Sequence, residues 1–377
     1  MKRILRNIII CLALVPVLPA CQSGDEPAPA PGGEDAPVCS FSIYIATDKG
    51  TGSRAPSDGE YNPGAGFENY IDISGEDFSI AIYDKDNAWM ANVESAVIVP
   101  FDDNFLSSKR YLLQCNLDRE TAEAINDKGS IKLVMMANWR HKYPVLDETS
   151  HLTTLFDAAT AMDYKNGLPG PDLTRDDKIA MFGVCQYDGV ELKPNIVTEL
   201  GTLHLLRALA KIEVWDAPET VKPIQSVTLT RRKKGAMPMP LGVTHQNHYI
   251  KNQYDGDYVL TPSFSTELDN MDAEITEPIA LIKDEKGHFI IYSPEFRNKG
   301  RLTDNLRARL AVSYDDGDTF YIDFTQNSVN IDILRNYWYK FEINRTTYEI
   351  NPKVDVLPYG VTHLDPSFGI DPNLPQN

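Results

Sequence analysis

Two histidines, His245 and His248, lie three residues apart and come closest in this sequence to the spacing of metal ligands. Imidazoles at this spacing can bind zinc from one face of a helix, but a third Cys, His or carboxylate must complete the site. Pro238, Pro240 and Gly242 favour a loop before the pair, and no third ligand stands at a suitable spacing. We therefore expect surface-loop histidines, with no metal and no cofactor.

Motifs for nucleophilic, phosphate or dinucleotide chemistry are missing from the sequence. It contains no Gly-x-Ser-x-Gly, no Gly-rich loop followed by Lys-Ser/Thr, and no dinucleotide fingerprint. Residues 315–318, Asp-Asp-Gly-Asp, lack the alternating ligands and terminal Glu of a calcium loop, so a hairpin turn is expected there. Asp and Glu are abundant, which leaves a glycosidase open as a third class, but the spacing singles out no acid pair. We expect a protein that is not an enzyme.

Cys21 carries the clearest chemical signal in the chain. Three basic residues open the sequence, the apolar residues 8–17 follow, and Leu-Pro-Ala directly precedes the cysteine. These features predict a secretory signal that is too short to span a membrane. Leu-Pro-Ala-Cys resembles a bacterial lipobox, which implies cleavage after Ala20 and lipid chains, including palmitate, on Cys21. An ordinary signal peptide that happens to precede a cysteine is the alternative.

Residues 21–38 are rich in Pro, Ala and Gly and predict an extended tether between the lipid and the folded part. The acidic pair Asp25-Glu26 resembles the export signal of Bacteroidetes-type surface lipoproteins, which implies the outer face of the outer membrane. The formal charge is −18, and loss of the signal, with three basic residues and no acid, makes it −21. Nucleic acid and anionic membrane surfaces are therefore unsuitable partners.

Three cysteines, Cys39, Cys115 and Cys185, remain after the signal is removed and Cys21 is lipidated. Their odd number and wide spacing do not describe a disulfide framework, and no Cys-x-x-Cys suggests zinc. We expect buried free thiols, with one disulfide plus one free thiol as the alternative.

Apolar and polar residues alternate over many short runs that end at turn residues, which predicts strands. The clearest hairpin joins 310–314 to 320–324, because the Asp-Gly pair between them favours positive φ. Short helices are predicted at 118–125 and 151–161. Many short strands with few helices predict an all-β fold of two β-sandwiches.

Residues 199–214 combine alternating apolar positions with the helix-prone Leu-Leu-Arg-Ala-Leu-Ala-Lys, and we predict a strand in preference to a helix. The two sandwiches are predicted to join near residue 200. The predicted divisions are the signal peptide 1–20, the tether 21–38, the N-terminal sandwich 39–198, the C-terminal sandwich 199–351 and the tail 352–377.

Three segments of the sequence, taken in order, carry a family resemblance. They read Ile-Ala-Met-Phe-Gly at 179–183, Leu-Arg-Ala-Leu-Ala-Lys-Ile-Glu-Val at 206–214 and Ile-Leu-Arg-Asn-Tyr-Trp-Tyr-Lys-Phe at 333–341. Together they resemble the Bacteroidales fimbrillin superfamily, the subunits of type V fimbriae. The resemblance implies two transthyretin-like β-sandwiches and export as a lipoprotein. In polymerising members an arginine-specific protease removes the first strand, and a strand from the next subunit fills the groove.

Carried onto this chain, the resemblance implies cleavage between Arg54 and Ala55, which would remove residues 39–54 with the first strand. Pro56 and a short, proline-interrupted tail depart from the pattern and leave open a subunit that keeps its lipid. The residues implied in strand exchange are apolar and alternate along the chain. In the removed strand they are Phe41, Ile43 and Ile45, and in the candidate donor they are Val354, Val356 and Leu357, with Val361.

The sequence thus favours a structural subunit of a fimbria (pilus) that assembles by β-strand complementation and contributes to adhesion. Its expected partners are other fimbrial subunits, the outer membrane through Cys21, and an arginine-specific protease. A lipid-retaining anchor or accessory subunit is one alternative. A monomeric surface glycan-binding lipoprotein is another, with Trp89 and Trp139 as candidate stacking platforms, although packing in a core or at its rim is the more common role of such residues.

Overall fold

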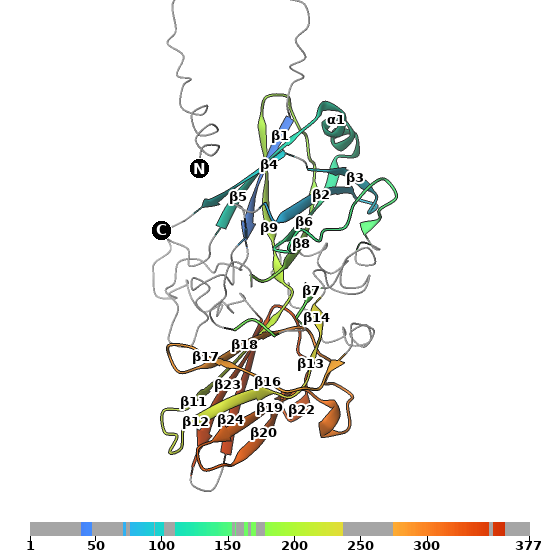
Figure 1. Cartoon of the computed structure of the whole chain (residues 1–377). Coiled ribbons are helices and arrows are strands. Elements are labelled where there is room, and N and C mark those ends of the chain that lie inside the picture. Colours follow the sequence, from blue (N-terminus) through green and yellow to red (C-terminus); the bar gives the residue numbers. More distant parts are fainter. Residues whose placement is uncertain are drawn as a thin grey trace, which may run out of the picture. The chain divides into compact units, whose positions relative to one another are not determined.

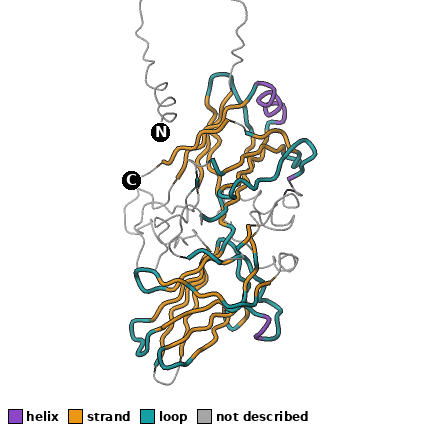
Figure 2. The backbone as a smooth tube through the Cα atoms, in the orientation of Figure 1, coloured by secondary structure: helices purple, strands orange, loops and turns teal. Residues whose placement is uncertain are grey.

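The computed structural model describes residues 39–46, 71–72, 76–93, 95–101, 110–152, 155, 162–164, 167–170, 178–236, 274–346 and 350–358. All of them belong to one compact unit, 36–377. Strands form nearly all of the regular structure (Figure 2), so the predicted all-β fold is confirmed.

Two sheets enclose the first core, and we call them together the first sandwich. One sheet has the order β4-β5-β1-β9 and the other the order β10-β8-β6-β2-β3. The strands of the first sheet are β1 Cys39–Ala46, β4 Ser95–Phe101, β5 Arg110–Leu117 and β9 Val197–His204. Those of the second are β2 Phe78–Asp84, β3 Trp89–Asn92, β6 Ser130–Ala137, β8 Met181–Asp188 and β10 Leu206–Arg207.

β6 lies in the middle of its sheet and is buried on both faces. Leu133 and Met135 belong to the core that this sheet shares with β1, whereas Val134 and Met136 pack in a second cluster with Trp139. Double burial explains why β6 reads as an almost continuous apolar run instead of an alternating one.

Two further sheets form the second sandwich, with the orders β17-β18-β11-β23-β24 and β16-β12-β19-β20. The first contains β11 Ala210–Asp216, β17 Ile282–Lys283, β18 Phe289–Ser293, β23 Tyr337–Arg345 and β24 Ile350–Pro358. The second contains β12 Ile224–Leu229, β16 Ile279–Ala280, β19 Arg309–Tyr314 and β20 Thr319–Asp323. Phe324 packs edge-on against Tyr339 and Phe341 in this core, with ring centroids 5.5 and 5.2 Å apart.

Short pairs of strands form separate two-stranded sheets. They are β7 Met162–Asp163 with β14 Gly235–Ala236, β13 Arg232–Lys233 with β15 Glu274–Ile275, and β21 Thr325–Gln326 with β22 Val329–Asn330. A 3-10 turn spans Asp304–Leu306.

The helix predicted at 118–125 is confirmed as α1, Arg119–Lys128. The side chain of Asp118 caps its first turn by accepting a hydrogen bond from the backbone of Thr121 at 2.8 Å, and Gly129 ends it at φ 66°. The predicted hairpin is also confirmed, because β19 pairs with β20 around Gly317 at φ 88°. The second predicted helix, 151–161, falls mostly outside the described residues.

The predicted strand at 199–214 forms three strands, β9, β10 and β11, which are interrupted at Leu205 and at a bend over residues 208–209. β9 and β10 pair within the first sandwich and β11 within the second. The first sandwich therefore extends through Arg207, beyond the predicted boundary at 198, and β24 crosses the boundary predicted at 351. Alternation along a sequence reports a strand and its inward face, but not the sheet in which that strand pairs.

Candidate functional site

β1 occupies an interior position of its sheet, between β5 and β9 (Figure 1). It pairs with β5 in antiparallel register over all eight residues, from Cys39 opposite Leu117 to Ala46 opposite Arg110. It pairs with β9 in parallel register, with a shift between Ser42 and Ile43. An interior strand makes ladder hydrogen bonds on both sides, so β1 joins β5 and β9, which are far apart in the sequence.

The three residues predicted to fill the groove are brought together on the inner face of β1. Phe41, Ile43 and Ile45 are each 0 % exposed, and they share one cluster with Leu113 of β5 and Leu203 of β9. Burial of such a side chain contributes roughly 1.5–3 kcal/mol, or about 5–9 kcal/mol for the three together. Side-chain packing therefore holds β1 in addition to its two ladders.

All three thiols, Cys39, Cys115 and Cys185, are buried and free, so the predicted free thiols are confirmed and the alternative disulfide does not form. Cys115 lies opposite Phe41 in the β1–β5 ladder. Burial raises the pKa of the Cys185 thiol to about 12 and raises the pKa of the Cys115 thiol above its ordinary value. Both thiols stay protonated at neutral pH, which makes them unreactive.

The candidate donor residues lie on β24, the edge strand of its sheet. β24 pairs with β23 in antiparallel register over nine residues, from Tyr337 opposite Pro358 to Arg345 opposite Ile350. Val354 and Val356 are half-buried and pack against the core of the second sandwich, and Leu357 lies opposite Trp338. In this structure the segment completes a sheet of its own chain.

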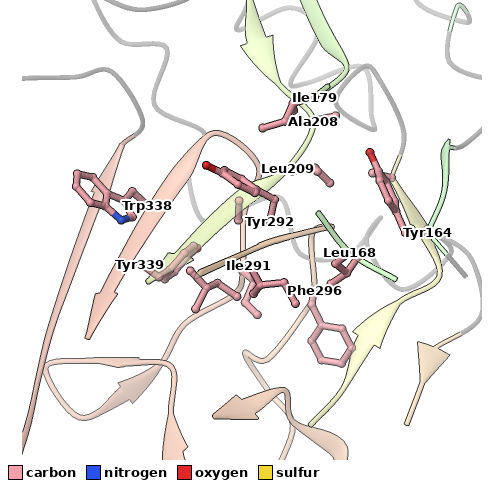
Figure 3. Close-up of a cluster of buried hydrophobic side chains, with 14 of the residues drawn as sticks. Tyr164, Leu168, Ile179, Ala208, Leu209, Ile291, Tyr292, Phe296, Trp338 and Tyr339 are labelled. Carbon is pink, nitrogen blue, oxygen red and sulfur yellow. The ribbon is translucent and has the colours of Figure 1, made fainter. Parts of the chain in front are cut away.

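The three segments that carry the family resemblance meet in the fold. The backbone N–H of Ala208 donates to the carbonyl of Ala180 at 2.8 Å, and that of Asn336 donates to the carbonyl of Leu209 at 3.0 Å. The Arg207 guanidinium donates to the Asn336 side-chain oxygen at 3.1 Å, across 129 positions of sequence. Figure 3 shows Ala208 and Leu209 beside residues from distant segments.

A buried ion pair lies next to this junction. Arg335 donates to Glu295 with an Nη2–Oε2 distance of 2.7 Å, and its backbone N–H donates to the same carboxylate at 3.2 Å. Both side chains are almost completely buried. Sequence reasoning identified Arg207, Arg335 and Asn336 as motif residues but not as contacts of the core. A usable signal was the placement of these polar side chains inside apolar runs.

One of the two candidate glycan-stacking residues is ruled out by the structure. Trp139 is 0 % exposed and packs against Tyr143, so it cannot stack on a glycan, whereas Trp89 is partly buried.

The acidic turn at 315–318 is a hairpin turn, as expected. Asp316 pairs with Lys222 and with Arg345, whose Nη2 lies 2.8 Å from it. The bond from Lys222 and the bonds from Arg345 hold the pKa of the Asp316 carboxyl well below its usual range.

Several predicted residues lie outside the described part of the chain, namely Ala20, Cys21, Arg54, Ala55, His245, His248 and Val361. Among the described residues, no group of three or more His, Cys, Asp or Glu side chains is placed to hold a metal ion. The same residues include no helix with the length and apolar character needed to cross a membrane.

No family model and no curated protein matches the sequence. Among solved structures, the C-terminally truncated tip fimbrial protein Mfa3 from Porphyromonas gingivalis is 12 % identical with a TM-score of 0.45, over 84 % of this chain and 99 % of that one. A fimbrial assembly protein from Parabacteroides distasonis is 12 % identical with a TM-score of 0.40, over 84 % and 97 %. The fimbrial anchor protein Mfa2 from P. gingivalis is 10 % identical with a TM-score of 0.30, over 85 % and 98 %.

Bacteroidales fimbrial proteins are thus among the structural neighbours of this chain, as the three sequence segments predicted, although at low sequence identity. At these identities and TM-scores, the function has to be argued from the chain's own residues.

Proposed function

We propose that this chain is a non-catalytic structural subunit of a cell-surface fimbria, exported as a lipoprotein through Cys21 and assembled by β-strand complementation, with a role in adhesion. The interior position of β1 carries the proposal. β1 is a short strand, the first that the structure describes, and it is paired on both sides. The sequence directly after it is Gly-rich and contains Arg54.

Removal of β1 has a defined physical consequence. It would free the backbone donors and acceptors of β5 and β9 that now face it, and it would uncover the apolar side chains around Phe41, Ile43 and Ile45. A strand supplied by another subunit would restore both the hydrogen bonds and the buried surface. The same interactions that hold β1 can therefore hold a second subunit.

The test is the N-terminus and intact mass of the protein recovered from the cell surface, alone and as an Arg54→Ala variant. We expect a mature chain that begins at Ala55, with ladders that survive mild detergent, and the loss of both in the variant. Arg119→Ala, which alters an exposed arginine of α1, is the control and should leave processing unchanged. An acylated Cys21 in all surface material would contradict this route and leave a lipid-retaining anchor or accessory subunit.

A further inference from the structure

β1 and β24 differ in their prolines. β24 carries Pro352 and Pro358, whereas Cys39–Ala46 contains none. Proline has no backbone N–H to donate, so it is suited to an edge strand, where one side of the backbone has no ladder partner. β24 is such an edge strand, and β1 is an interior one. The two strands therefore have different backbone chemistry.

The side-chain pattern of β1 restricts how any other strand could take its place. Four inward positions, at 39, 41, 43 and 45, are occupied by Cys39, Phe41, Ile43 and Ile45, all of them buried. A replacement strand must present apolar residues at these alternate positions and donate N–H groups to both neighbours along its length.

β24 could take the place of β1 in three registers that bury both Val354 and Val356. Each of these registers puts a proline at one or more of the four inward positions. With Val354 at position 41, Pro352 falls at 39 and Pro358 at 45. With Val354 at 43, Pro352 falls at 41. With Val354 at 39, Pro358 falls at 43. Each register removes at least one ladder hydrogen bond from an interior strand.

The opposite face of β24 is no better, because it would turn Lys353 and Asp355 into the core, where unpaired charges are strongly unfavourable. Beyond Pro358 the next proline is Pro366, so the longest proline-free run between 350 and 377 is 359–365. That run has seven residues, one fewer than β1 pairs, and its alternate residues include His363 and Asp365 on one face.

We infer that the strand that fills the gap between β5 and β9 is not supplied by residues 350–377 of a second copy of this chain. The donor segment is a proline-free strand of at least eight residues with apolar side chains at four alternate positions. It runs antiparallel to β5 and parallel to β9. This inference rests on the proposed function and specifies its donor strand.

The experiment uses the full-length chain with a sequence-specific protease site inserted after Gly52. Cutting at that site leaves β1 in place without a covalent link. Fluorescent peptides are then added under reducing conditions, and their exchange for β1 is followed by gel filtration. The peptides correspond to residues 39–46, to residues 350–377, and to 350–377 with Pro352→Val and Pro358→Val. The last peptide places valine at all four inward positions.

We expect the 39–46 peptide to exchange, the natural 350–377 peptide to bind at least about tenfold more weakly, and the double valine variant to recover binding. A matched control, Lys353→Val with Leu357→Val, also adds two valines but keeps both prolines and should recover nothing. Equal binding of the natural 350–377 and 39–46 peptides would overturn the inference and favour residues 350–377 of a second copy as the donor. Failure of the 39–46 peptide itself to exchange would instead contradict strand complementation, and with it the proposed function.

Discussion

Asp77 illustrates how a single side chain organises a loop of the first sandwich. Its carboxylate accepts hydrogen bonds from the backbone of Arg140 at 3.0 Å, the backbone of His141 at 2.9 Å and the hydroxyl of Tyr143 at 2.8 Å. The Lys178 ammonium lies 3.5 Å away. Burial acts to raise the pKa of Asp77. The three hydrogen bonds and Lys178 together lower the pKa by more than burial raises it, so it lies below the ordinary value.

The sign of this shift predicts a pH dependence. A carboxyl whose pKa is lower in the folded state adds stability above the unfolded-state pKa of about 4 and loses it as the pH falls through the folded pKa. Asp77→Asn should therefore lower the free energy of unfolding at pH 7 and reduce its decline between pH 5 and pH 3. Urea unfolding at several pH values measures both. Asp127→Asn, an exposed acid of α1, controls for the lost charge, and an Asp77→Asn slope equal to that of the unaltered chain would contradict the prediction.

At the scale of elements, local patterns predicted much of what the structure contains. The alternation in β1, the helix that begins after Asp118 and the Asp-Gly turn of the β19–β20 hairpin are encoded within a few residues, and the sequence predicts each of them. Other features depend on partners elsewhere in the chain. They are the breaks between β9, β10 and β11, the place of β24 at a sheet edge, and the contact of Arg207 with Asn336. No spacing within one segment reports such partners. The inward residues of the candidate site were therefore predictable, but the two strands that flank them were not.

The packing of β1 predicts the effect of truncating one side chain. Phe41→Ala should lower the free energy of unfolding by about 3–5 kcal/mol, because the side chain is fully buried and its loss leaves a cavity. It should also speed the reaction of the Cys115 thiol, which lies opposite Phe41, with a thiol reagent. Urea unfolding and reagent kinetics measure the two effects. Ser42→Ala, at a half-buried position of the same strand, should change neither by much, and equal behaviour of the two variants would argue against a packed β1.

At the scale of the whole molecule, a single apolar cluster joins residues from before and after Arg207. It includes Ile179 and Phe182 together with Phe296 and Tyr339. Asn336 stands at this junction, with φ 57° and a hydrogen bond from Arg207. Shared burial of this kind couples the unfolding of the parts that contribute to it.

We expect a single calorimetric unfolding transition for the chain and a broadened or divided one for Asn336→Ala, which loses the Arg207 contact and strains a positive φ. Asn195→Ala is the matched control, because Asn195 has φ 61° on an exposed turn and should preserve one transition. A single sharp transition in both variants would mean that the Arg207–Asn336 contact is not needed to couple the two sandwiches.

The two neighbours of β1 run in opposite senses relative to it, and this has a consequence for the form of any assembly. β5 is antiparallel to β1 and β9 is parallel to it, so a reversed strand would meet a different hydrogen-bond pattern on each side. Each insertion then has one direction, and the contact joins two different surfaces. A fibre built through this contact has structural polarity, with one end that presents an open acceptor and another that presents a free donor, so growth and termination at its two ends require different molecules.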